Sequence, residues 1–129
     1  MKNIETLQPY ALSMLRIVAG LVILSYGVQK ILGFPAAEGP PAWSLPWIAG
    51  LFELICGFLV LIGFQTRIAA FILSGVMAFA YFLRHAPQDF FPAQNGGVAA
   101  ILFCFVFLYL AVAGAGPLSA DDAISKRQI

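Results

Sequence analysis

Four ionisable side chains interrupt the long apolar runs of this sequence, namely Arg16, Lys30, Glu53 and Arg84. A charged side chain inside a membrane-spanning helix costs about 2.5–3.5 kcal/mol on insertion scales, so each of these residues requires a structural or functional reason. At helical rise, Lys30 and Glu53 lie roughly 6 and 10 Å inside the same end of their runs. We therefore predict that they form an ion pair, which either links two helices or belongs to a ligand or proton site.

Arg16 lies on the same helix face as Lys30 but nearer the other end of its run. Its long side chain can extend to the lipid headgroups at that end. Alternatively, it points into the bundle and reaches towards Glu53 as a ligand-binding or proton-relay residue. The sequence leaves both interpretations open.

Polar side chains are expected to gather at the depth of the predicted ion pair. They are Gln29, Lys30, Glu53, Tyr81, Arg84 and His85. A quinone head needs hydrogen-bond donors for its carbonyl oxygens, which Lys30, Tyr81 or His85 can supply, and a proton path, for which Glu53 is suited. His85 equally fits an interfacial position, and Tyr26 and Tyr81 fit core positions with hydrogen-bonded hydroxyls.

The composition indicates that the surface around these residues faces lipid. Of the 129 residues, 61% are hydrophobic and 10% charged, against about 45–50% and 25% in soluble domains. The formal net charge of +1 argues against a nucleic-acid partner. A single histidine and the absence of C-x-x-C predict no zinc site, and Cys56 and Cys104 lie inside apolar runs, as buried thiols do.

The apolar runs predict an all-α fold, an antiparallel integral membrane four-helix bundle that forms a single transmembrane domain over residues 1–129. The predicted helices cover residues 10–34, 46–64, 68–85 and 97–115. Proline-containing loops are predicted at 35–45 and 86–96, with a tight turn at 65–67 and a short polar tail at 119–129. The loop 86–96 should form an ordered cap, because Pro87 and Pro92 restrict it and Phe90 and Phe91 can anchor it.

Small residues next to the charges predict where the helices approach one another. Glycines at interfaces allow close packing of membrane helices, and we assign this role to Gly20, Gly27, Gly50, Gly57, Gly96 and Gly97. Asn95, which precedes the last two glycines, is a predicted cap of the fourth helix.

The distribution of lysine and arginine predicts the orientation in the membrane. Lys2, Arg67, Lys126 and Arg127 flank one side of the predicted bundle, whereas only Lys30 and Arg84 lie towards the other. By the positive-inside rule, both termini are cytoplasmic and the two longer loops face outwards, in a plasma or inner membrane.

Several segments of the chain resemble the DoxX family of small four-helix membrane proteins. The resemblance runs over roughly residues 15–117. It is carried by Leu15-Arg16-Ile17, Gly27-Val28-Gln29-Lys30, Gly50-Leu51-Phe52-Glu53, Thr66-Arg67, Tyr81-Phe82, His85-Ala86-Pro87, Phe90-Phe91-Pro92 and Asn95-Gly96-Gly97. Tyr26 departs from the pattern, since the family commonly has histidine there.

The resemblance implies a redox-associated function, because relatives are linked to thiosulfate:quinone oxidation, quinol oxidase complexes and thiol stress. We therefore expect an accessory subunit that offers a quinone or small-thiol site and works with another membrane or redox protein, either as one copy or as a homo-oligomer. Whether the chain is itself an enzyme, and whether quinone is its cofactor, stay open. The rival interpretations are a scaffold or assembly protein without chemistry and, third, a small transporter.

Overall fold

The described part of the chain is almost entirely helical. The computed structural model describes residues 2–34 and 39–127, and no strand occurs within these ranges. Its elements are α1 (Lys2–Thr6), α2 (Gln8–Leu32), α3 (Leu45–Ile62), α4 (Thr66–Ala80), the π-helical turn η1 (Tyr81–His85), α5 (Pro92–Asn95), α6 (Val98–Ala113) and α7 (Ala120–Arg127). The predicted all-α fold is confirmed; residues 35–38 of the predicted loop 35–45 lie outside the described residues.

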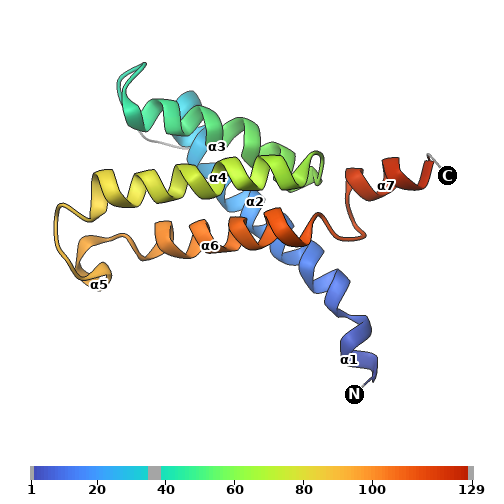
Figure 1. Ribbon diagram of the computed structural model, residues 1–129. Coiled ribbons are helices and arrows are strands. Elements are labelled where there is room, and N and C mark those ends of the chain that lie inside the picture. Colours follow the sequence, from blue (N-terminus) through green and yellow to red (C-terminus); the bar gives the residue numbers. More distant parts are fainter. Residues whose placement is uncertain (1, 35–38, 128–129) are drawn as a thin grey trace.

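The four long helices form an antiparallel bundle in which three lie side by side. Figure 1 shows α3, α4 and α6 as neighbours, with α2 crossing them diagonally. Helix α2 packs mainly along α3, α3 on α4, and α4 on α6. We call the end that carries the α3–α4 turn and α7 the turn end, and the opposite end, which carries α5, the loop end (Figure 1).

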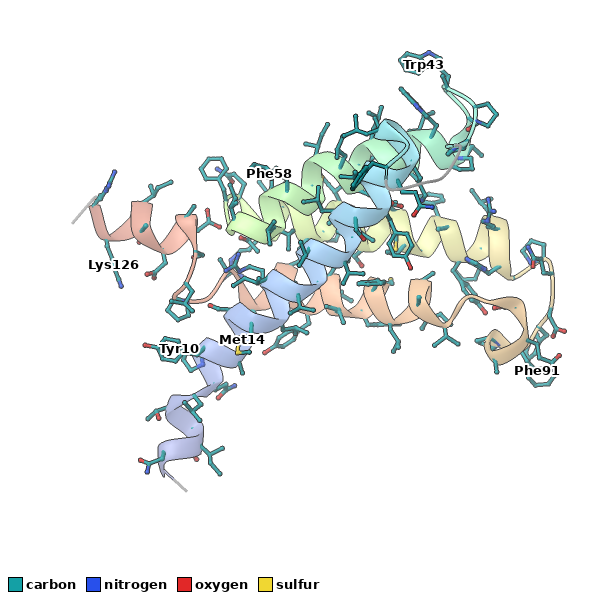
Figure 2. All side chains as sticks on the ribbon, turned by 180° about the vertical axis from the view of Figure 1, so that it is seen from behind. Tyr10, Met14, Trp43, Phe58, Phe91 and Lys126 are labelled. Carbon is teal, nitrogen blue, oxygen red and sulfur yellow. The ribbon has the colours of Figure 1, made fainter. Side chains whose placement is uncertain are left out.

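The apolar core lies between the four helices, and most other apolar side chains point away from it. The core residues are Ala19, Ile23, Cys56, Val60, Ala69, Ala70, Leu73, Met77, Phe107 and Leu110. Only 33% of the most apolar window of α2 and 28% of that of α3 are buried. For example, the side chain of Met14 is 63% exposed and that of Phe58 is 50% exposed, and both project outwards (Figure 2). Such a surface needs a lipid environment.

Three helices, α2, α3 and the continuous stretch Thr66–His85, are long and apolar enough to cross a membrane, whereas α6 is shorter. The fourth helix was predicted to run to residue 115 but ends at Ala113, because Gly114 has a φ of +90° and breaks the helix. Its 16 residues span about 24 Å.

Two further differences from the sequence-based boundaries concern the third helix and the C-terminal tail. Helix α4 widens into η1, where the Ala86 N–H donates to the carbonyl of Tyr81, five residues earlier, at 2.8 Å. The tail predicted after residue 119 contains α7, which begins near the α3–α4 turn. Local sequence favours a helix here, since Ser119 accepts from the Asp122 N–H and acidic residues occupy the first turn, but the attachment of α7 to the bundle depends on contacts with α4 that are described below.

Candidate functional site

An ion pair joins α2 to α3 on the side of the bundle towards the loop end. Lys30 Nζ lies 2.8 Å from Glu53 Oε1, which confirms the pairing predicted from their depths. The Glu53 side chain is only 2% exposed, whereas that of Lys30 is 30% exposed. The second carboxylate oxygen, Glu53 Oε2, is buried and has no hydrogen-bond partner among the described residues. A buried oxygen of this kind favours a proton or an incoming hydrogen-bond donor.

Glycines make this ion pair possible because they let α2 and α3 approach closely. Four of the predicted packing glycines, Gly20, Gly27, Gly50 and Gly57, lie in this interface. A Cβ atom on Gly27 would lie 2.5 Å from the backbone nitrogen of Leu54. A Cβ atom on Gly50 would lie 2.8 Å from Lys30 Cβ, so Gly50 leaves the space that the lysine stem occupies.

A second polar cluster lies at the loop end and is centred on Asn95, which is 3% exposed. The side-chain nitrogen of Asn95 donates to the Tyr81 hydroxyl at 3.3 Å and to the Asp89 carbonyl at 3.0 Å. The side-chain oxygen of Asn95 accepts from the Gly97 N–H at 2.8 Å, and its main-chain carbonyl accepts from His85 Nδ1 at 3.0 Å. Asn95 therefore ties η1 to α5 and to the start of α6.

Gly96 and Gly97 lie in the turn between α5 and α6, and of these two predicted packing glycines only Gly97 allows a close approach, that of Tyr81 in η1 to the start of α6. Gly96 has a φ of +73°, and a Cβ atom on Gly97 would lie 2.7 Å from the Tyr81 ring. Asn95 does not cap α6, because its side-chain oxygen binds the N–H of Gly97, which precedes the helix.

The six polar residues predicted at one depth are not joined in one contact network. Lys30 and Glu53 pair across α2 and α3, whereas Tyr81 and His85 belong to the Asn95 cluster. The side chains of Gln29 and Arg84 are exposed and contact neither group through hydrogen bonds. The division arises because the end of α2 packs on α3, whereas η1 faces α5 and the start of α6.

Arg16 is fully buried at the turn end, which excludes the interpretation that its side chain extends to the headgroups. Its guanidinium donates to four backbone carbonyls. They are those of Val60 at 2.8 Å, Leu61 at 2.9 Å, Ala115 at 2.8 Å and Leu118. Two of them are in the last turn of α3, where carbonyls lack helical partners and a positive charge is favourable. Arg16 thus joins α2 to the end of α3 and to the segment after α6, and does not pair with Glu53.

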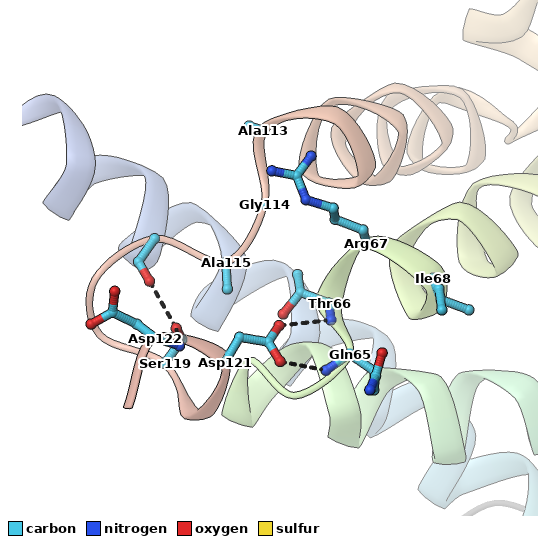
Figure 3. A pocket seen from close by; sticks show the side chains of 11 residues that line it. Gln65, Thr66, Arg67, Ile68, Ala113, Gly114, Ala115, Ser119, Asp121 and Asp122 are labelled. Atoms are coloured by element: carbon cyan, nitrogen blue, oxygen red, sulfur yellow. Dashed lines mark hydrogen bonds between the residues drawn. The ribbon is translucent and has the colours of Figure 1, made fainter. Parts of the chain in front are cut away.

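Two more charged side chains at the turn end satisfy backbone groups of other helices. Arg67 donates to the carbonyls of Ala111, at 3.4 Å, and Val112 in the last turn of α6. The carboxylate of Asp121 accepts from the N–H groups of Gln65, at 2.8 Å, and Thr66, at 3.0 Å, at the start of α4 (Figure 3). These residues border an open cavity of about 560 Å³ at the turn end.

Three polar residues with contacts between segments were not among the candidate site residues from the sequence, namely Ser13, Asn95 and Asp121. Ser13 is fully buried, and its hydroxyl accepts from the Leu118 N–H at 3.1 Å. Asp121 lies in the segment that was predicted to be a short polar tail, and Asn95 was assigned only a capping role. The one signal available for Ser13 was its spacing from Arg16, which places both residues on one face of α2.

The comparisons with known proteins agree with this architecture. The model of the DoxX family matches residues 11–86. The chain belongs to the DoxX family. An uncharacterized protein of Haemophilus influenzae is 38% identical over 98% of this chain and the whole of that protein. The inner membrane protein YqjF of Escherichia coli is 28% identical over 87% of this chain and 90% of its own length, and an uncharacterized membrane protein of Mycobacterium tuberculosis is 28% identical over 92% and 84%.

No solved structure matches the chain. The region matched by the DoxX model runs from α2 to the end of η1, so it contains the Lys30–Glu53 pair, Tyr81 and His85. Asn95 and α6 follow the matched region. This DoxX protein is therefore a membrane protein with several apolar helices. The Lys30–Glu53 pair lies within the matched segment, and the cluster around Asn95 extends from its end to the residues directly after it.

Proposed function

We propose that this protein is a redox-associated accessory subunit whose loop end binds a quinone or a small thiol or sulfur compound. The observation that carries the proposal is Glu53, a carboxylate that is 2% exposed and has one oxygen paired with Lys30 and the other without a partner. Reduction or oxidation of a quinone transfers protons along with electrons, so a site for it benefits from a buried group that accepts and releases a proton.

The two residues have different parts in this proposal. The Lys30 side chain is 30% exposed, so one N–H group of its ammonium can donate to a carbonyl oxygen of a bound molecule while another holds Glu53. Glu53 Oε2 then receives or returns a proton. Electrons are exchanged between the bound compound and a partner protein, which is why we propose a subunit.

The location that fits this function is the inner or plasma membrane, with both termini in the cytoplasm. Arg67, Lys126 and Arg127 belong to the turn end, which supports a cytoplasmic position for this end by the positive-inside rule. The loop end then faces outwards. An impermeant thiol reagent should label Ala42→Cys in intact cells but Ser125→Cys only after permeabilisation, in a background that lacks Cys56 and Cys104. The reverse pattern contradicts this orientation.

Binding of a quinone or sulfur compound to the protein in lipid nanodiscs tests the proposed function. Ubiquinone-1, menadione and thiosulfate serve as probes, and at least one should bind the wild type. Glu53→Gln should lose this binding while the helical content and the elution volume stay unchanged. Glu5→Gln is the matched control, because Glu5 is exposed on α1. Failure of the wild type to bind any of the three probes rejects the function.

A scaffold without chemistry is the second candidate, and the structure offers an observation in its favour. Arg16, Arg67 and Asp121 all bind backbone groups of helices other than their own, so they stabilise the arrangement of helices. If the Lys30–Glu53 pair has the same role, Glu53→Gln lowers stability but leaves capture of a partner by the folded fraction unchanged. Pull-down in mild detergent with wild type and Glu53→Gln separates the two candidates.

A further inference from the structure

The cluster around Asn95 fixes the hydrogen atoms of two side chains at the loop end. Asn95 Oδ1 accepts from the Gly97 N–H, which determines the orientation of the side-chain amide. The other end of the amide must then be NH₂, as its second partner, the Asp89 carbonyl, also requires. The Tyr81 oxygen therefore accepts a hydrogen bond from Asn95, and the hydroxyl hydrogen of Tyr81 is left to donate elsewhere.

The same reasoning fixes the tautomer of His85. A carbonyl oxygen can only accept, so the bond between His85 Nδ1 and the main-chain oxygen of Asn95 requires a hydrogen on Nδ1. In the neutral imidazole, Nε2 then carries the lone pair. Within residues 2–34 and 39–127, no hydrogen bond to His85 Nε2 or from the Tyr81 hydroxyl occurs.

We propose that Tyr81 and His85 form a donor–acceptor pair that binds an uncharged ring carrying oxygen substituents, and that Asn95 is its positioning residue. The two rings have centroids 6.5 Å apart and planes inclined by 31°. Both side chains are partly exposed, whereas Asn95 is buried. The pair presents one O–H donor, from Tyr81, and one acceptor nitrogen, His85 Nε2, from residues at the two ends of the single turn η1.

This pair deepens the proposed function and rests on it, because it selects between the two forms of a quinone. The oxidised form offers only carbonyl acceptors and can use the Tyr81 hydroxyl alone. The hydroquinone form has O–H groups and can in addition donate to His85 Nε2. The site should therefore favour the hydroquinone. Tyr81 and His85 are four residues apart, so they share a face of the turn η1 and both reach Asn95.

The tautomer can be measured directly, because His85 is the single histidine of the chain. Nitrogen-15 NMR of histidine-labelled protein in nanodiscs should show that the neutral ring has a protonated Nδ1 and an unprotonated Nε2. Addition of ubiquinol-1 should shift the Nε2 resonance more than addition of ubiquinone-1. A neutral ring with its hydrogen on Nε2 overturns the assignment.

Binding of the two forms to matched variants completes the test. His85→Asn retains an amide that can donate to the Asn95 carbonyl but removes the atom at the Nε2 position. The affinity for ubiquinol-1 should therefore fall about fivefold, which corresponds to the loss of one neutral hydrogen bond. The affinity for ubiquinone-1 should not change. Tyr81→Phe should weaken both forms about fivefold. Tyr109→Phe, which removes an exposed hydroxyl from α6, is the control.

The outcomes separate this inference from the function on which it rests. Unchanged binding of both forms to Tyr81→Phe and His85→Asn overturns the donor–acceptor pair, while loss of binding in Glu53→Gln still supports the proposed function. Failure of the wild type to bind either form overturns the assignment of the ligand to this pair; if menadione and thiosulfate also fail, the proposed function is rejected as well.

Discussion

The ammonium group of Lys30 lies 2.8 Å from one carboxylate oxygen of Glu53, and the other oxygen of Glu53 has no partner among the described residues. The two side chains differ greatly in their access to the surroundings, since Lys30 is 30% exposed and Glu53 only 2%. The pair is therefore asymmetric. Lys30 can turn to solvent or headgroups when it loses its partner, but Glu53 cannot.

This asymmetry predicts unequal effects of the two single substitutions. Lys30→Met strands a buried carboxylate and should lower the free energy of unfolding by about 3 kcal/mol. Glu53→Gln leaves a lysine that can reorient, and should cost about 1 kcal/mol. The double variant should be more stable than the sum of the two effects implies, as measured by denaturation in detergent micelles. Strict additivity contradicts an energetically coupled pair.

The close approach of α2 and α3 predicts that Gly27 does not tolerate a larger side chain. Gly27→Ala places a Cβ atom 2.5 Å from Leu54 N, which forces the two backbones apart and should cost about 2 kcal/mol. Gly75→Ala is the matched control, since nothing lies within 4 Å of its Cβ position. The control should gain about 0.5–1 kcal/mol from better helix propensity. Equal midpoints for both variants in thermal denaturation would show that the α2–α3 contact is looser than described.

The four carbonyl contacts of Arg16 predict that even a polar substitution is costly. Arg16→Gln leaves the carbonyls of Leu61 and Leu118 without their donor and removes one of two donors from those of Val60 and Ala115, so it should lower the free energy of unfolding by more than about 3 kcal/mol. Hydrogen exchange should increase in the segment 115–118 and in the last turn of α3. Arg84→Gln is the control, because that side chain is exposed, and it should change stability by less than about 0.5 kcal/mol.

The capping role of Asp121 predicts a local effect on α7. Asp121→Ala removes the acceptor for the Gln65 and Thr66 N–H groups and should cost about 1 kcal/mol, as loss of a helix cap does. Hydrogen exchange in α7 should become faster. Asp122→Ala, which only removes an ion pair with the exposed Lys126, should leave exchange at the α3–α4 turn unchanged. Equal exchange in both variants argues that other contacts hold α7.

Residue types and spacing alone determined much of this protein. The low charge content and the four apolar runs predicted a helical membrane bundle, because a chain in lipid must satisfy its backbone internally. The depth of Lys30 and Glu53 and the glycines beside them predicted one interhelical pair, since helical periodicity fixes which residues share a face and how far they lie from a helix end.

Only the tertiary structure decided the roles of Arg16, Asn95 and Asp121. Their partners are mainly backbone carbonyls and N–H groups at the ends of other helices, at Val60, Thr66 and Gly97 for example. Every residue type presents these backbone groups, so no motif in the sequence marks them as partners. They become available only where a helix ends and another segment lies beside that end, and this depends on how α2 crosses the bundle and where α5 and α7 fold back.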